Sequence, residues 1–402
     1  MSVGSAAALV AGTTVGAGVL ALPAATRGAG FVASSGVLVA SWAFMAVAAL
    51  LVAETSVGVV CATGRVDLGF LATVRSLCGP RVGSVAGAAY AFIHYALLVA
   101  YAAQGGALLA GAVGADPALG AVAFSGVLGG TVAFGSGDVV DAVNNAFVVV
   151  VVASFSALLC LGSGEFDAGR LFATSGDTGA AFGAVPISIL ALVYHNVVPL
   201  VATRLRGDRR KIAAAILAGS AVPLVMFLLW NGLILGSVDG DAVAAAGGDP
   251  VAALVAAEGA AAAPALGPTV ALFSLSAVVT SFVGFYFGLR TYLRDLFLGD
   301  DGGGPLADAA ESEVLLAALV LAPPTLVACV DPKIFLPALD AAGTFGITTL
   351  FGIIPAVAAY RQREGAADGE VYVPGGAATL GAMVAISAAV LGEGVLDGVG
   401  VL

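Results

Sequence analysis

Long apolar segments almost free of charged residues recur along the whole chain, and they limit what it can fold into. The segment 34–62, for example, contains a single charged residue, Glu54. A helix needs about 20 mostly apolar residues to cross a bilayer, and lipid tolerates only helices and closed barrels as spanning backbones. No alternating pattern of the barrel type is present, so the chain is predicted to be an all-α integral membrane protein. We predict eleven transmembrane helices, at residues 4–26, 34–62, 83–112, 117–134, 142–162, 183–203, 211–236, 267–296, 312–330, 334–360 and 375–396.

Composition excludes two other classes of protein. Of the 402 residues, 60% are hydrophobic and 10% are charged, whereas soluble domains contain roughly 45–50% apolar and about 25% charged residues. The 15 Lys and Arg residues are outnumbered by 26 Asp and Glu residues, so no basic surface for nucleic acid is expected. The four cysteines lie far apart and form no Cys-x-x-Cys or Cys/His cluster. We therefore expect contact with the lipid bilayer, and no nucleic-acid partner, metal ion or cofactor.

The basic residues predict an orientation in the membrane. With the N-terminus on the cytoplasmic side, or its organellar equivalent, only Arg27, Arg170 and Lys333 of the 15 basic residues lie on the outer side. Basic residues gather on the inner side of membrane proteins, so this asymmetry supports the topology. An odd number of helices then places the C-terminus on the opposite side. The pattern fits a plasma membrane and an organellar membrane, such as that of a plastid, equally well.

The segment AGTTVGAGVLALP, residues 11–23, has Gly16, Gly18 and Ala21 in the spacing of a dinucleotide-binding fingerprint. That fingerprint needs a preceding strand and an acidic residue about 20 positions later. Here the glycines lie inside a predicted span, and residues 36–51 contain no Asp or Glu. Glycines in a membrane helix either allow another helix to approach closely or weaken the helix itself. This segment alone leaves both interpretations open.

A second weakened helix is predicted in VPISILALVYHNVVPLVATRLRG, residues 185–207. It carries the polar sequence Tyr194-His195-Asn196 in mid-span, with Pro199 shortly after. Interrupted helices at corresponding positions of two halves are the best sequence indication of a transporter's central site. A half-helix N-terminus offers free N–H groups and a positive dipole to a carboxylate. The two interruptions together favour a transporter whose site lies where both helices break.

The segment GTTVGAGVLALP resembles the first-span signature of the aromatic amino acid permeases. These form the tryptophan/tyrosine permease family of the amino acid–polyamine–organocation superfamily. Further matching blocks follow in the order of the family across most of the chain. They are LLVAETS (50–56), HYALLVAYAAQGG (94–106), the segment 194–230 and TSFVGFYFGLRTYLRD (280–295).

The resemblance implies a single transporter domain, residues 1–402, with a leucine-transporter-like fold and discontinuous helices 1 and 6. Helices 1–5 (1–162) and 6–10 (183–360) would form a five-plus-five inverted repeat, with helix 11 (375–396) in addition. Members are not enzymes but secondary active symporters. They carry tryptophan, tyrosine or related neutral amino acids by alternating access, mostly with protons. At the sixth helix, bacterial members commonly have a Phe-His-Gly type of sequence, so the asparagine here leaves the side-chain preference open.

The resemblance also implies roles for particular residues. The backbone amides of Gly16, Ala17 and Gly18 would face the substrate carboxylate. The other half of the substrate site would be lined by Tyr194, His195 and Asn196. Tyr101 in the third span is a candidate for the pocket wall or a gate, with packing between helices as its structural interpretation.

Glu54 and His195 are the candidates for proton coupling, since a buried carboxylate and an imidazole can both bind and release protons. Each also has a structural interpretation, as a hydrogen-bonded packing residue. A sodium ion is the alternative coupling ion. The resemblance to the broader superfamily implies its ligands, the carbonyls of Gly12 and Val15 with the hydroxyls of Thr280 and Ser281, and oxygen ligands suit a hard cation. The two hydroxyls also have a structural interpretation, as hydrogen-bond donors between helices.

Two further functions compete with symport. A passive channel predicts a continuous polar stripe along several helices, whereas the polar residues here cluster at mid-depth. An intramembrane enzyme predicts a set of metal ligands or a catalytic pair within the membrane, and the chain has two histidines and few buried acids. Symport of an amino acid with a proton is therefore the preferred prediction.

Overall fold

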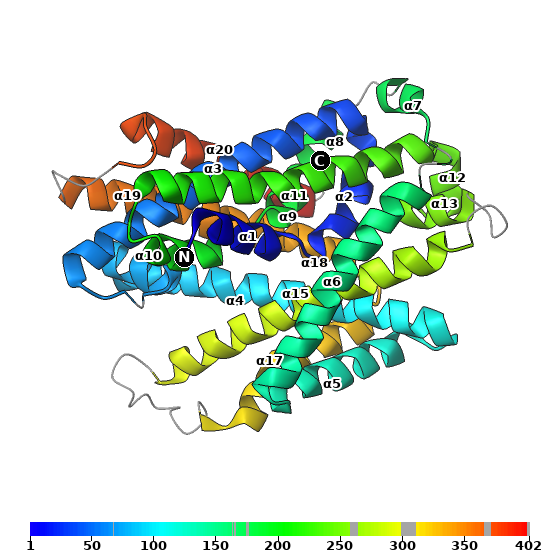
Figure 1. The fold of residues 1–402 in the computed structure, drawn as a ribbon, viewed down its shortest axis with the longest axis horizontal. Coiled ribbons are helices and arrows are strands. Elements are labelled where there is room, and N and C mark those ends of the chain that lie inside the picture. The colour runs from blue at the N-terminus through cyan, green and yellow to red at the C-terminus, as the bar shows by residue number, and fades with distance from the viewer. Residues whose placement is uncertain are drawn as a thin grey trace. The chain divides into compact units, whose positions relative to one another are not determined.

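The computed structural model describes residues 1–399 apart from 67, 163, 165, 174–176, 258–263, 299–310 and 366–370. Every regular element in these residues is a helix (Figure 1), which confirms the all-α prediction. The chain forms two compact units, each assembled from separate stretches of sequence. Unit 1 comprises Met1–Tyr90, Leu171–Gly232 and Ala341–Leu402, and unit 2 comprises Ala91–Arg170 and Leu233–Asp340. These units are not the predicted halves 1–162 and 183–360, and the inverted repeat stays a prediction.

The helices of unit 1 come from both ends and the middle of the sequence. Helix α4 (Phe70–Val113) begins in this unit, as does α11 (Arg209–Ser237), and both continue into unit 2. The other elements are α1 (Val3–Thr14), α2 (Gly18–Thr26), η1 (Arg27–Ala29), α3 (Gly30–Thr63), α8 (Thr178–Gly183), α9 (Val185–Ala191), η2 (His195–Val197), α10 (Val198–Arg204), the π-helix η3 (Ala342–Ile353), α19 (Ile354–Gly365) and α20 (Gly376–Gly398).

The helices of unit 2 include two packed pairs, α6 on α15 and α5 on α17. Rings also join α5 to α15, since Phe124 and Phe282 meet edge to face with centroids 5.3 Å apart, a favoured aromatic geometry. The elements are α5 (Pro117–Phe134), α6 (Gly137–Leu161), α12 (Gly240–Ala245), α13 (Pro250–Ala257), α15 (Leu266–Leu298), α17 (Glu313–Val330) and α18 (Phe335–Ala341), while α7 (Ala168–Ala173) lies at the boundary with unit 1.

Ten helical segments of the described residues are long and apolar enough to cross a membrane. The first of these, Gly18–Thr63, contains both α2 and α3, joined through η1 at Gly30, whose φ is 70°. The predicted first span 4–26 corresponds to α1 and α2, which are separate short helices. The count of eleven is therefore not confirmed, because the first span is divided into halves that are each too short to qualify alone.

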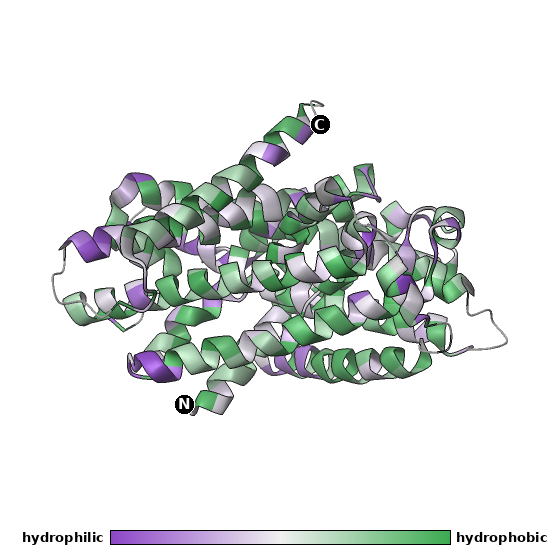
Figure 2. Cartoon of the chain, turned by 90° about the horizontal axis from the view of Figure 1, so that it is seen from above, coloured by the Kyte–Doolittle hydropathy of each residue, from purple (hydrophilic) through white to green (hydrophobic). Residues whose placement is uncertain are grey.

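Hydrophobic residues run along the lengths of the helices, and hydrophilic residues gather mainly at helix ends and connecting segments (Figure 2). Large apolar side chains are also exposed, among them Val127 at 73% and Val149 at 68%. Such exposure is costly in water but expected where a helix faces lipid. The distribution supports the membrane assignment.

Helices 1 and 6 are both discontinuous, as predicted. Helix α1 ends at Thr14, Val15 is extended (φ −74°, ψ 104°), and α2 begins at Gly18. Helix α9 ends at Ala191 and α10 begins at Val198, with the 3-10 turn η2 between them. Glycine in a helix interior costs about 1 kcal/mol relative to alanine, so the glycines of 11–23 favour a break.

The second break has a different local cause. Pro199 is one of the first two residues of α10, a position where the missing N–H has no partner within the helix. The proline therefore favours a helix that restarts at Val198 rather than one that continues from α9.

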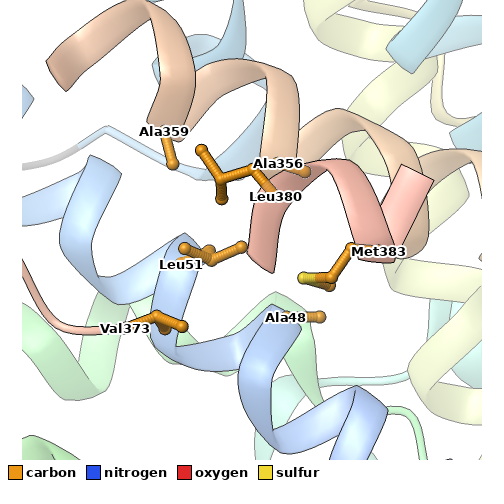
Figure 3. Close-up of a cluster of buried hydrophobic side chains, with 7 residues drawn as sticks. All are labelled: Ala48, Leu51, Ala356, Ala359, Val373, Leu380 and Met383. Atoms are coloured by element: carbon orange, nitrogen blue, oxygen red, sulfur yellow. The ribbon is translucent and has the colours of Figure 1, made fainter. Parts of the chain in front are cut away.

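One apolar cluster joins three helices of unit 1 (Figure 3). Helix α3 contributes Ala48 and Leu51, and α19 and α20 pack against it. All cluster members are at most 5% exposed. The remaining members are Ala356, Ala359, Val373, Leu380 and Met383.

A buried asparagine joins α11 to α2 and α3 within unit 1. Asn231 of α11 is fully buried, and its Oδ1 accepts a hydrogen bond of 2.7 Å from the Thr26 hydroxyl of α2. Its Nδ2 donates to the Ser34 hydroxyl of α3 at 3.1 Å. Polar side chains hold membrane helices together in this way, so the second half of helix 1 is fixed to α3 and α11.

Candidate functional site

The two helix breaks lie next to each other within unit 1. Gly18 is the first residue of α2 and Ala191 is the last of α9. A Cβ atom at Gly18 would lie 2.9 Å from the Ala191 Cα, closer than real Cβ contacts come. Only glycine allows this approach. The glycine motif therefore serves both purposes considered from the sequence, since it weakens helix 1 and brings the break against helix 6.

The first break ends in a helix N-terminus without a side-chain cap. Ala17 precedes α2 and makes no side-chain cap hydrogen bond. The first turn is closed by the Val19 and Leu20 amides, which donate to the carbonyls of Gly16 and Ala17 at 3.2 and 3.1 Å. The N-terminal end of a helix carries partial positive charge and favours a carboxylate. Gly16, Ala17 and Gly18 lie at this N-terminus, and their contact with a substrate carboxylate stays a prediction.

The second break places two polar aromatic residues in the interior. Tyr194 is 1% exposed and His195 is fully buried, whereas Asn196 is exposed. The 3-10 turn that begins at His195 directs neighbouring side chains to different sides. The structure therefore brings Tyr194 and His195 together, but not Asn196.

Three contacts fix the His195 ring. Its Nε2 donates to the Met45 carbonyl of α3 at 3.1 Å. The ring stacks on Tyr194, with centroids 5.0 Å apart, and on Phe351, with centroids 4.6 Å apart. Phe351 belongs to the π-helix η3, a rare structure that is frequent at functional sites.

Two buried atoms of this break have no hydrogen-bond partner among the described residues. They are the His195 Nδ1 and the Tyr194 hydroxyl. The hydroxyl lies near Ser220 of α11 without hydrogen-bond geometry. Buried polar atoms are hydrogen-bonded in the great majority of cases, so two such atoms on adjacent residues make this break a candidate binding site.

Sequence reasoning missed Met45, Ser220 and Phe351. Met45 acts through its backbone carbonyl, which its side chain does not reveal. Phe351 lies in the π-helix η3, in which the Thr348 hydroxyl also donates to the Gly343 carbonyl five residues earlier. The closely spaced glycines and threonines of 343–352 are the one local signal for an irregular helix here.

Tyr101, Thr280 and Ser281 belong to unit 2. The Tyr101 side chain is 3% exposed and lies near the Ser281 side chain. The Thr280 hydroxyl lies 3.1 Å from the carbonyls of Ser276 and Ala277 in its own helix, a common arrangement for threonine in helices.

Gly12 and Val15 belong to unit 1. Their predicted grouping with Thr280 and Ser281 around a cation stays a prediction. Within the described residues no group of three or more His, Cys, Asp or Glu side chains is arranged to hold a metal ion.

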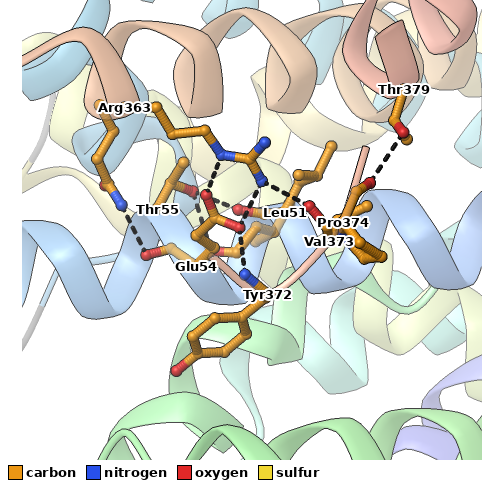
Figure 4. A network of polar contacts seen from close by, with 10 residues as sticks. Leu51, Glu54, Thr55, Arg363, Tyr372, Val373, Pro374 and Thr379 are labelled. Carbon is orange, nitrogen blue, oxygen red and sulfur yellow. Dashed lines mark hydrogen bonds and ion pairs between the residues drawn. The ribbon is translucent and has the colours of Figure 1, made fainter. Parts of the chain in front are cut away.

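Glu54 lies in an ion-pair network rather than alone (Figure 4). Glu54 as a whole residue is 2% exposed. Its carboxylate accepts hydrogen bonds from Arg363 Nε at 2.6 Å and from Arg363 Nη2 at 2.8 Å. The Tyr372 backbone N–H donates to the same carboxylate at 2.8 Å. Gln362 Nε2 donates to the Glu54 carbonyl at 3.2 Å. We call these four residues the Glu54 network.

The Glu54 network reaches a fourth segment of unit 1. The Tyr372 hydroxyl donates to the Gly207 carbonyl, between α10 and α11, at 3.0 Å. The network therefore joins α3, α19, the segment before α20 and the turn after α10. The arginine partner was not foreseen from the sequence.

Comparison with known proteins shows to which family the chain is similar. The model of the tryptophan/tyrosine permease family matches residues 1–392. The tyrosine-specific transport system 1 of Haemophilus influenzae is 28% identical over 384 residues, which cover 92% of this chain and 91% of that protein. The tryptophan-specific transport protein of the same organism is 27% identical over 398 residues, covering 94% and 92%. The low affinity tryptophan permease of Escherichia coli K12 is 26% identical over 373 residues, covering 89% and 86%.

Solved structures show the same fold. A crystal structure of a mutant Eremococcus coleocola manganese transporter has a TM-score of 0.61 at 17% identity, covering 96% of this chain and 84% of that one. A second structure of that transporter, in complex with an aromatic bis-isothiourea substituted compound, has a TM-score of 0.60. This likeness concerns the leucine-transporter-like fold. With a family match over almost its whole length and two broken helices in contact, the chain belongs to the tryptophan/tyrosine permease family.

Proposed function

We propose that this chain is a secondary active symporter that carries an aromatic amino acid, tryptophan or tyrosine, together with a proton. The observation that supports this most strongly is the contact between Gly18 and Ala191, which joins the breaks of helices 1 and 6. Transporters of this architecture bind substrate where discontinuous helices meet. The relatives named above are tyrosine-specific and tryptophan-specific transport proteins, which supports the choice of substrate.

The substrate would bind with its two ends in different surroundings. The N-terminus of α2, with Gly16, Ala17 and Gly18, favours the carboxylate. The buried residues Tyr194 and His195 supply aromatic surface and two polar atoms without partners. An amino acid with a ring that carries a polar group is complementary to this combination.

Glu54 is the residue to which we assign the coupling proton. In the described state its charge is balanced by Arg363. A proton on Glu54 would remove the charge that holds Arg363 and the Tyr372 segment against α3. Separation of α19 from α3 would in turn leave a buried carboxylate unpaired, a state that favours uptake of a proton. Protonation and helix movement are thereby linked through one ion pair.

The orientation predicted from Lys and Arg places the Glu54 network on the inner side of the membrane. A proton that enters from outside with substrate would then be released on that side. Arg363 would pair with the emptied carboxylate again, which completes the cycle without a metal ion or cofactor.

Reconstitution in liposomes tests the proposal. We expect radiolabelled tryptophan or tyrosine to accumulate when the outside is more acidic than the inside, and not with a sodium gradient alone. Accumulation with sodium alone would replace the proton by a sodium ion, for which Thr280 and Ser281 are the predicted ligands. Uptake that only equilibrates would indicate a passive facilitator. If no amino acid enters under any gradient, the transport proposal is wrong.

A further inference from the structure

The His195 ring offers a hydrogen-bond acceptor of defined position, and this inference rests on the proposed function. The Nε2 atom lies 3.1 Å from the Met45 carbonyl. A carbonyl oxygen can only accept, so Nε2 must carry the proton. In a neutral imidazole the other nitrogen then has a free lone pair.

The surroundings of the ring support the neutral form. His195 is fully buried, and no ion pair involving it is found among the described residues. Its ring faces are covered by Tyr194 and Phe351, which carry no charge. A buried charge without a partner is strongly disfavoured. Nδ1 is therefore an unprotonated acceptor.

That acceptor has no donor in the described part of the protein. A buried acceptor left unpaired costs free energy, and a ligand that supplies an N–H or O–H removes this cost. The stacking of the ring between Tyr194 and Phe351, together with the Met45 carbonyl, keeps Nδ1 from turning toward another donor. Nδ1 is thus held ready to accept a hydrogen bond from a donor that the described part of the protein does not supply.

The substrates named for the relatives indicate which donor this is. Tryptophan and tyrosine share one feature that phenylalanine lacks, a hydrogen-bond donor on the edge of the aromatic ring. It is the indole N–H in one and the phenol O–H in the other. The Tyr194 hydroxyl, on the residue next to His195 in the chain, is a second buried polar atom without a partner among the described residues.

We propose that His195 determines specificity by accepting a hydrogen bond at Nδ1 from the ring N–H or O–H of the substrate. Met45, through its carbonyl, and Phe351, through its ring, act as positioning residues. A site that forms a hydrogen bond with a polar group of its ligand strongly rejects a similar ligand that lacks this group, because the polar atom of the site is then left unpaired. An apolar pocket discriminates between two such ligands far less. Phenylalanine, and a tryptophan analogue without the N–H, would therefore bind poorly.

Equilibrium binding to the purified protein in nanodiscs tests this. The ligands are tryptophan, tyrosine, phenylalanine and β-(3-benzothienyl)alanine, in which sulfur replaces the indole N–H with little change in size. We expect the affinity of the wild type for tryptophan to exceed that for the benzothienyl analogue by about tenfold or more, and the same for tyrosine compared with phenylalanine. In His195→Phe, which keeps an aromatic ring for stacking, both ratios should fall to within about twofold. His195→Gln, which retains an acceptor, should keep part of the preference.

Two results would overturn the inference. One is a wild type that binds tryptophan and its benzothienyl analogue equally, and the other is a His195→Phe protein that keeps the wild-type ratios. If His195→Phe does not elute as a single folded species, His195→Leu is measured instead. Should neither fold, the wild-type ratios decide alone, with about tenfold supporting the inference and equality rejecting it. A wild type that binds none of the four ligands would instead contradict the proposed function itself.

Discussion

Glu54 and Arg363 are 309 positions apart in sequence and form a two-point ion pair, with Arg363 Nε at 2.6 Å and Nη2 at 2.8 Å from the carboxylate oxygens. The carboxylate side chain is 1% exposed and that of the arginine is 17% exposed. The Tyr372 N–H completes the set of donors. Because the partners lie on α3 and α19, the pair fixes the distance between these two helices.

The stability of unit 1 should depend on this pair being complete. Arg363→Met leaves the Glu54 charge buried without its partner, and such losses destabilise by about 3–5 kcal/mol. Replacing both, as Glu54→Leu with Arg363→Met, removes the unpaired charge and should recover most of that loss. The check is thermal or denaturant unfolding of the three proteins in detergent. Equal destabilisation by the single and the double change would contradict a buried ion pair.

Proton coupling should be lost when Glu54 can no longer change its charge. For Glu54→Gln combined with Arg363→Gln, which keeps a neutral hydrogen-bonding pair, we expect exchange of labelled for unlabelled tryptophan to persist. Accumulation driven by a pH gradient should fall to the level without a gradient. Both assays use the same proteoliposomes. Undiminished gradient-driven accumulation would show that Glu54 is not the proton carrier.

The contact between the two breaks should be intolerant of any side chain at Gly18. Gly18→Val would place atoms within 2.9 Å of the Ala191 backbone, so α2 and α9 would have to move apart. We expect binding of tryptophan to weaken by about tenfold or more, since small displacements at a site have large effects. Gly36→Ala is the matched control, because a Cβ there has nothing within 4 Å. If Gly18→Val and Gly36→Ala bind tryptophan with similar affinity, the contact between Gly18 and Ala191 is not needed for binding.

Asn231 should contribute less to stability than Arg363 does. Its partners Thr26 and Ser34 have other acceptors within reach, the carbonyls of Leu22 and Phe31. Hydrogen bonds between membrane helices contribute on average about 0.6 kcal/mol and at most about 1.7 kcal/mol. Asn231→Ala should therefore destabilise within that range in the same unfolding assay. Ser156→Ala, whose hydroxyl bonds only its own helix, should leave stability unchanged, and a loss as large as that of Arg363→Met would refute this ranking.

Much of the fold follows from local properties of the sequence. The predicted span 117–134 coincides with α5 (Pro117–Phe134), because an apolar segment in lipid has no alternative to the helix. The breaks at Gly16–Gly18 and at Tyr194–Pro199 were also predicted, since glycine and proline act on the backbone at their own positions. The count of eleven spans was not confirmed, because α1 is too short to count alone and α2 is counted in one segment with α3.

The candidate site was predicted less completely, and the reason is physical. The sequence determined that Gly16, Gly18, Tyr194 and His195 lie at helix breaks, because breaking a helix depends on the few residues around each one. Only the tertiary structure decided that Asn196 is exposed, that Arg363 neutralises Glu54, and that Met45 and Phe351 fix His195. These outcomes depend on which faces of distant helices pack together, and no local pattern of residues determines that.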